Sequence, residues 1–292
     1  MRQITPKSLT TTSQTYLDKL QGEVINGKTP TDDTSFEAQV ARAENTWKPK
    51  NKAFDEIKET LTGMTVSNRC NYCECDRAVD MEHIYPKSKF PERAYTWTNY
   101  ILACSACNSY IKGDKFAVFY PHGSNQKMEL PRGVGKPPSD DGLLINPRLE
   151  DPQQYLRLNL VTRTFIFDPI ESDEDARDYQ RAAYTTCLLD INNPILQKSR
   201  EAKASELVGY LRKYTEVCGT TDYEALKKVP NYPIEIDQTL PFEEEKERIK
   251  NEYKKRIIES PHLTVWDELK RQRACLPQVD SLFAEAGECL SW

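Results

Sequence analysis

Apolar side chains recur every three to four residues in the N-terminal part of the chain, residues 1–63. This period places them on one face of a helix, so the pattern predicts amphipathic helices. Three such helices are predicted, over residues 13–24, 35–49 and 53–61. The second is expected to close at Pro49, since proline disrupts a helix interior. Residues 1–63 are therefore predicted to form a helical segment.

The pattern becomes shorter and less regular over residues 64–120. Apolar and polar residues alternate from Ala78 onward, which predicts a short strand that ends with Glu82 and His83. A short helix is predicted over residues 108–112. This stretch is therefore expected to be a compact mixed region that follows the N-terminal helices.

Proline and glycine occupy eight of the twenty-two positions in residues 121–142, which predicts a loop or linker. Residues 143–292 begin with two strand-like runs, 155–160 and 164–167, that predict a β-hairpin. The remainder is predicted to be helical, over residues 176–189, 195–217, 242–258, 263–273 and 279–286. The predicted fold class is therefore α+β, with helical regions at both ends.

The composition is polar, with 38% hydrophobic and 29% charged residues. No apolar run approaches the length of a membrane span, and the beginning of the sequence lacks the apolar core of a signal peptide. The nine cysteines are odd in number, and four of them form closely spaced pairs. These features favour a protein of the reducing cytoplasm that does not enter a membrane.

Two C-x2-C pairs stand out, Cys70 with Cys73 and Cys104 with Cys107. Two thiolates at this spacing can face one ion, so the pairs predict a Zn2+ site with four cysteine ligands. The alternative is four buried, reduced cysteines that bind no metal. Cys75 could replace Cys73, although the matching spacing favours Cys73. A site closed by four thiolates is structural and leaves no position for catalysis.

The segment between the two pairs contains candidate chemistry. Glu82, His83 and Asn108 are predicted to converge beside the zinc site, because the second pair fixes a helix start against the strand. Carboxylate and amide oxygens are hard ligands that suit Mg2+ or Mn2+. A neutral imidazole beside them can accept a proton from water near pH 7. A single histidine is more often structural, but its position relative to the two cysteine pairs favours hydrolysis of a phosphodiester.

The stretch from Arg69 to Phe116 resembles an HNH (ββα-metal) endonuclease of the zinc-stapled kind. The resemblance rests on the motif E-H-x-x-P-K-S…W-T-N-Y-I-L-A-C-x-x-C-N-x-x-x-K-G-D. It implies a ββα-metal core with a structural four-cysteine zinc site, flanked by the N-terminal helices and by the C-terminal hairpin and helices.

The same resemblance assigns roles to individual residues. It implies that Glu82 binds the catalytic metal and that His83 is the general base. Asn99 would hold the loop that orients the base, and Asn108 would be the second metal ligand. Two positions depart from the commoner pattern, because Asn108 stands where many members have histidine and Glu82 stands where aspartate is commoner. Loss of an imidazole ligand favours Mg2+ or Mn2+ over Zn2+ in the catalytic site.

Three further runs narrow the resemblance: P-K-S-K-F-P, C-N-x-x-x-K-G-D and L-L-I-N-P-R-L-E-D-P. They are similar to Septu-type (PtuB-like) HNH nucleases of bacterial anti-phage defence, which also occur beside retrons. This similarity implies an ABC/SMC-like ATPase as a partner subunit.

The charge distribution also favours a partner subunit that contributes to nucleic-acid binding. The formal net charge is −5, and residues 69–120 reach only +1. A protein that binds nucleic acid alone usually carries a basic surface. Lys87 and Lys112 are the candidates for phosphate contacts. DNA is the favoured target over RNA, although both phosphodiesters fit the chemistry.

Two other functions stay open at this level. The chain could be a zinc-stapled binding or scaffold subunit without catalysis, which the presence of Glu82, His83, Asn99 and Asn108 disfavours. It could also be a nuclease that is silent until an ATPase partner presents the substrate, which the acidic balance favours.

Overall fold

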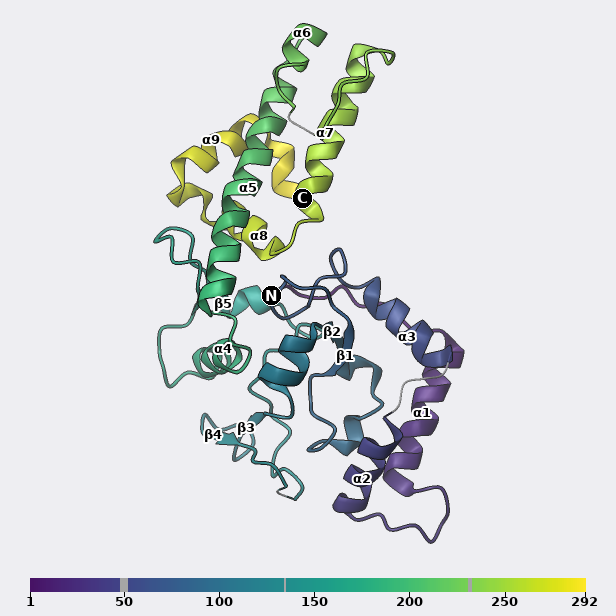
Figure 1. The fold of residues 1–292 in the computed structure, drawn as a ribbon. Helices are drawn as coiled ribbons and strands as arrows, with labels where there is room; N and C mark the ends of the chain where they lie inside the picture. The colour runs from purple at the N-terminus through teal and green to yellow at the C-terminus, as the bar shows by residue number, and fades with distance from the viewer. Residues whose placement is uncertain (48–51, 134, 231–232) are drawn as a thin grey trace. The chain divides into compact units, whose positions relative to one another are not determined.

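The computed structural model describes residues 1–47, 52–133, 135–230 and 233–292. The chain divides into two compact units, both drawn in Figure 1. The first unit comprises Met1–Arg157 and Phe167–Asn193, and the second comprises Leu158–Ile166 and Pro194–Trp292. This division differs from the predicted one. The predicted segments 1–63, 64–120 and 121–142 belong to one unit, and the predicted region 143–292 is shared between both.

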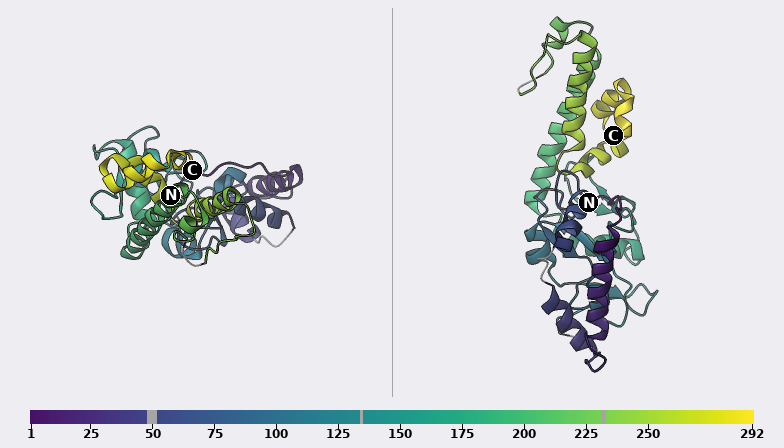
Figure 2. Two further views of the ribbon diagram at one scale, coloured as in Figure 1. Left: turned by 90° about the horizontal axis from the view of Figure 1, so that it is seen from above. Right: turned by 90° about the vertical axis from the view of Figure 1, so that its right-hand side faces the viewer.

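Three helices open the first unit, as predicted. They are α1 (Thr11–Asn26), α2 (Phe36–Thr46) and α3 (Lys52–Thr62), of which α1 is the long purple helix in Figure 2. Ser35 caps α2, because its side chain accepts a hydrogen bond from the backbone N–H of Ala38 at 3.3 Å. The predicted helix end at Pro49 lies outside the described residues.

A short antiparallel hairpin and a helix follow. Strand β1 (Asp80–His83) pairs with β2 (Tyr100–Ala103) so that His83 lies opposite Tyr100. All four residues of β2 are buried. The helix η3 (Ala106–Lys112) has π geometry and begins two residues earlier than predicted. The order β1, β2, η3 confirms the predicted strand and places a ββα unit inside the first unit.

The predicted loop over residues 121–142 contains a strand. Strand β4 (Lys127–Glu129) pairs antiparallel with β3 (Ala117–Phe119). The side chains of β3 are buried, whereas those of β4 are exposed. Because all residues of β4 are exposed, its sequence shows no extended alternation of apolar and polar residues. The strand forms through backbone hydrogen bonds with β3.

Further short elements and one helix complete the first unit. These are η1 (Pro91–Arg93), η2 (Trp97–Asn99), η4 (Pro152–Gln154), β5 (Leu156–Leu158), β6 (Phe167–Pro169) and α4 (Arg177–Leu188). The last residue of β5, Leu158, is assigned to the second unit. Strands β5 and β6 form a two-stranded sheet, so the predicted hairpin is present and its first strand is shorter than predicted. The second strand was predicted over residues 164–167 but begins only at Phe167, so that part of the prediction is wrong.

The second unit is helical, as predicted. It contains α5 (Pro194–Cys218), α6 (Tyr223–Leu226), α7 (Phe242–Ile258), α8 (Leu263–Gln272), η5 (Arg273–Cys275), α9 (Pro277–Glu285) and η6 (Gly287–Ser291). Helices α5 and α7 run side by side (Figure 1). The charged helix α7 buries Ile249, Tyr253 and Ile257 on one face. None of the helices in the described parts of the chain has the length and apolar character needed to cross a membrane.

Candidate active site and structural metal centre

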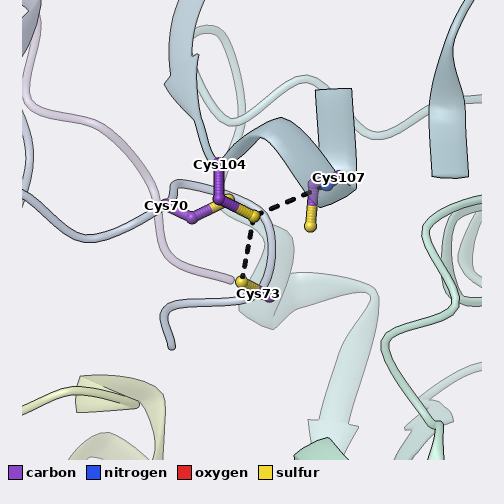
Figure 3. Close-up of side chains that lie close together, drawn as sticks. All are labelled: Cys70, Cys73, Cys104 and Cys107. Atoms are coloured by element: carbon purple, nitrogen blue, oxygen red, sulfur yellow. Dashed lines mark hydrogen bonds between the residues drawn. The ribbon is translucent and has the colours of Figure 1, made fainter. Parts of the chain in front are cut away.

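Four cysteines come together in the first unit. The Sγ atoms of Cys70, Cys73, Cys104 and Cys107 lie within 4.8 Å of one another, and all four residues are buried (Figure 3). The cluster found among the described residues contains Cys73 and not Cys75, which is half-buried. Four convergent thiols are the donor set of a closed tetrahedral zinc site. The residues therefore fit the predicted structural Zn2+.

The backbone around the cysteines explains how the cluster forms. Asn71 fixes the first pair to β2, because its backbone N–H and its side-chain amide both donate to Leu102 O, at 3.0 and 2.9 Å. Cys104 directly follows β2, and Cys107 lies in η3. A hydrogen bond with Cys107 is the largest cause that lowers the pKa of Cys104, which favours the thiolate that zinc requires. The cluster thus holds the turn of Cys70 and Cys73 against the end of β2 and the start of η3.

Three of the predicted site residues line a cavity separate from the cysteine cluster. Glu82, His83 and Asn108 line one cavity of about 700 Å3, together with Lys87 and Trp47. Glu82 and His83 are buried, since they stand on β1 next to the fully buried β2. The structure therefore brings a carboxylate, an imidazole and an amide to a common space.

The ring of His83 is held in a defined orientation. Its Nε2 atom lies 2.9 Å from Ala94 O. A carbonyl oxygen only accepts hydrogen bonds, so Nε2 carries the hydrogen and Nδ1 keeps the lone pair. Burial lowers the pKa of His83 to about 3, and the charge of Lys87 adds to this effect. His83 is therefore neutral near pH 7 and can accept a proton at Nδ1.

Asn99 contributes by fixing the loop in front of His83. Its Oδ1 accepts a hydrogen bond from the backbone N–H of Tyr85 at 2.8 Å. Its Nδ2 donates to Tyr85 O at 3.0 Å and to Arg93 O at 2.9 Å. Residue Ala94 follows Arg93 directly, so Asn99 positions the carbonyl that orients His83. These hydrogen bonds are the ones that the role predicted for Asn99 requires, and the role itself stays a prediction.

Glu82 has a buried partner. Lys112 Nζ lies 2.5 Å from Glu82 Oε1 and donates to His83 O at 2.9 Å. The side chain of Lys112 has no exposed surface. Burial raises the pKa of Glu82, and the charge of Lys112 opposes that rise. The predicted phosphate contact needs an accessible ammonium, so the structure does not support that role for Lys112.

The donor set at this cavity fits a hard divalent cation. Glu82 offers a buried carboxylate, and Asn108 offers an amide oxygen on the same cavity. Because Lys112 already contacts Glu82, a bound cation would share that carboxylate with the ammonium or displace it. The residues that would hold Mg2+ or Mn2+ are thus present, with a positive charge beside them.

Comparison with known proteins agrees with this geometry. Residues 70–112 match the HNH endonuclease family. The matched HNH segment contains the four clustered cysteines and the four predicted catalytic residues, which are Glu82, His83, Asn99 and Asn108. The resemblance inferred from the motif is therefore confirmed for this segment.

A longer stretch is similar to the Septu protein PtuB of Bacillus thuringiensis. The two sequences are 26% identical over 107 residues. This stretch is 35% of the present chain and 32% of the PtuB protein, so the chain matches about a third of that relative.

The cations around the HNH segment have different surroundings. Lys87 lines the His83 cavity, and burial lowers its pKa. Lys89 Nζ donates to Pro131 O at 3.0 Å, and Arg93 forms an ion pair with Asp140 at 2.7 Å. Of the two predicted phosphate contacts, Lys87 and Lys112, only Lys87 therefore remains a candidate at the His83 cavity.

Sequence reasoning missed the contribution of the N-terminal helices to this cavity. Val40, Glu44 and Trp47 line it. The rings of Trp47 and His83 have centroids 4.2 Å apart in an edge-on arrangement. From the sequence, Trp47 was expected only to lie on the apolar face of the predicted helix over residues 35–49, and no signal in the sequence separates such a residue from an ordinary core residue.

Proposed function

We propose that this protein is a metal-dependent endonuclease that hydrolyses phosphodiester bonds of nucleic acid at the His83 cavity. A neutral His83, oriented by Ala94 O, shares that cavity with Glu82 and Asn108, and this arrangement carries the proposal. The match of residues 70–112 to HNH endonucleases supports it.

The residues divide the reaction between them. His83 takes a proton from the attacking water at Nδ1, and Asn99 keeps the loop in place while the imidazole becomes charged. Lys87 meets a phosphate oxygen at the cavity wall. Glu82 and Asn108 would hold Mg2+ or Mn2+, which would supply stabilisation of the charge on the phosphoryl group and on the leaving 3′ oxygen.

The biological setting is proposed from similarity and charge. Similarity to the Septu protein PtuB over about a third of the chain supports a role in anti-phage defence. The net charge of −5 supports a partner that contributes affinity for the substrate, and we propose an ABC/SMC-like ATPase for this part. DNA is the proposed target. Free cysteines, including the four of the cluster, agree with action in a reducing cytoplasm.

A second candidate function rests on the ion pair between Lys112 and Glu82. An ammonium 2.5 Å from the proposed metal ligand neutralises it without a divalent cation. This observation favours a zinc-stapled nucleic-acid-binding or scaffold subunit that does not catalyse hydrolysis. Binding of Mn2+ at this site, followed by its electron paramagnetic resonance signal, would argue against that alternative.

The deciding experiment compares wild type with His83→Ala on plasmid DNA and on RNA, with Mg2+ or Mn2+. Each reaction is run with and without any ATPase that is found encoded next to this protein. His122, an exposed loop histidine, supplies the control His122→Ala. We expect cleavage by wild type and by the control, no cleavage by His83→Ala, and equal zinc content in all three. Cleavage by His83→Ala at the wild-type rate would contradict the mechanism.

A further inference from the structure

A second cavity adjoins the His83 cavity in the first unit. It has a volume of about 1010 Å3, and strand β4 and helix α4 both contribute to its lining. Asp114 and Arg132 line both cavities, and their side chains contact each other at 2.9 Å. We term this space the hairpin cavity. A ligand in it would lie next to a group bound beside His83.

Aromatic and aliphatic side chains form much of the wall of the hairpin cavity. They come from the segment before β3, from the chain after β4 and from α4, and they are Phe116, Leu130, Tyr179, Tyr184 and Leu188. Phe116 and Tyr184 are almost fully buried and form the floor of the cavity, and Lys127 lies over the ring of Tyr184. The half-buried Leu130 and Tyr179 provide the accessible apolar surface. A preformed, largely apolar hollow with aromatic walls suits a planar group such as a nucleobase, whose face stacks on aromatic rings.

One polar group in this wall lacks a partner. The hydroxyl of Tyr184 is buried and makes no hydrogen bond among the described residues. Burying a hydroxyl without a partner is costly, so this group marks a place where a water or a ligand can supply the missing hydrogen bond. The edge of a nucleobase carries both donors and acceptors, and either could pair with a tyrosine hydroxyl.

The charged residues of the hairpin cavity favour an anionic ligand. Four cations line it, Lys89, Lys115, Lys127 and Arg132, and three carboxylates do so, Asp114, Glu129 and Glu174. Lys127 pairs with Glu129, and Arg132 pairs with Asp114. Lys115 is exposed and forms no ion pair within the described part of the chain. It is therefore placed to meet a phosphate of a strand that enters the cavity.

We propose that the hairpin cavity receives an unstacked nucleobase of the nucleic-acid substrate, next to the phosphate that is cut in the His83 cavity. This proposal rests on the proposed nuclease function and adds to it a selection step. A base must leave the stack to enter such a hollow, so single-stranded, mismatched or otherwise opened sites are the preferred substrates.

Cys187 provides a direct probe of occupancy. It is exposed and lines the hairpin cavity, whereas the exposed Cys275 belongs to the second unit and serves as an internal control. The zinc-loaded His83→Ala protein is alkylated with iodoacetamide, and the two cysteines are followed by peptide mass spectrometry. The ligands are short single-stranded DNA, RNA of the same sequence, an abasic DNA strand of equal length, and free dAMP.

We expect the base-bearing DNA or RNA to slow alkylation of Cys187 and to leave Cys275 unchanged, while the abasic strand gives little protection. Equal protection by the abasic strand, or no protection by either base-bearing strand, would overturn the proposal. Protection by free dAMP alone would overturn the assignment to the substrate and indicate a nucleotide effector.

A matched pair of variants tests the same cavity by filling it. Ala183→Trp, on α4, places a large ring in the hairpin cavity, and Ala204→Trp does the same in a cavity of the second unit. In the His83→Ala background, Ala183→Trp is expected to weaken strand binding about tenfold, the loss of one stacked base, and Ala204→Trp to leave it unchanged. Equal affinities for both variants would contradict the proposal. Cleavage by wild type, measured in parallel, separates failure of the cavity from failure of the nuclease function.

Discussion

Lys112 Nζ lies 2.5 Å from Glu82 Oε1, and both side chains are buried inside the HNH segment. The pair joins the end of η3 to β1, since Lys112 also donates to His83 O. It therefore serves the packing of the ββα unit and at the same time sets the charge that an incoming metal ion meets. A divalent cation must therefore bind Glu82 tightly enough to share the carboxylate with this ammonium or to displace it.

Removing the ammonium of Lys112 should therefore destabilise the zinc-loaded protein when the His83 cavity holds no divalent cation. It should also make the stability of the protein depend on added Mn2+. Lys112→Met leaves the carboxylate of Glu82 buried without its cation, which should lower the free energy of unfolding by about 3–5 kcal/mol. Mn2+ should restore part of this loss and should stabilise wild type less. Urea denaturation of the zinc-loaded protein, with and without Mn2+, measures both effects.

The double variant Glu82→Gln with Lys112→Met is the control for that experiment, because it removes both charges. It should lose less stability than Lys112→Met and show no response to Mn2+. Wild-type stability in Lys112→Met would show that the ion pair contributes nothing.

Asn99 should act on catalysis through the position of His83. Asn99→Ala removes three hydrogen bonds to the loop, among them the only one shown for the backbone N–H of Tyr85 among the described residues. We expect a fall in kcat of about a hundredfold with a smaller change in KM, and a loss of stability of about 3 kcal/mol. Steady-state kinetics on a defined substrate separates the two constants.

Asn99→Asp is the informative comparison, since a carboxylate can still accept from Tyr85 N–H but cannot donate to Arg93 O. Its kcat should lie between those of wild type and Asn99→Ala. An unchanged kcat in Asn99→Ala would refute the positioning role.

Zinc should be needed for the fold of the first unit. Cys104→Ser removes one of four clustered ligands, so bound zinc and cooperative unfolding of that unit should both be lost. Cys275→Ser, which changes an exposed cysteine of the second unit, should have neither effect. Metal analysis and circular dichroism melts test this. A Cys104→Ser protein that melts like wild type would exclude a structural zinc.

His83 should make the zinc-loaded protein less stable in mild acid when no divalent cation is bound in the His83 cavity. Its pKa is about 3 when folded and about 6.5 when unfolded, so the unfolded state binds more protons between these values. The free energy of unfolding should therefore fall as the pH drops below 6.5, by about 2 kcal/mol at pH 5. This stability is fully present above pH 6.5.

His83→Gln does not titrate in this range, and its amide can still donate to Ala94 O. Denaturation of both proteins at pH 7 and pH 5, zinc-loaded and without added divalent metal, isolates the contribution of His83. Parallel losses in the two proteins would contradict the buried, neutral state of the ring.

The sequence by itself determined the features that depend on local spacing. The two C-x2-C pairs predicted the cysteine cluster, because a turn of this length brings two sulfurs to one point whatever surrounds it. The alternation that ends in Glu82 and His83 predicted β1. The long amphipathic helices were equally readable, since each carries its own repeating apolar face.

Packing between distant segments decided the rest. Lys112 and Asn108 share a short helix, yet only the tertiary structure buries the ammonium against Glu82, thirty positions earlier. Trp47 reaches His83 from the end of α2, and the exposed strand β4 forms because β3 offers it hydrogen bonds. Such contacts join residues far apart in the chain, and the identity of one residue does not encode the position of the other. The local pattern therefore supplied the chemical groups, and the fold decided which of them face the cavity and which are used to hold it.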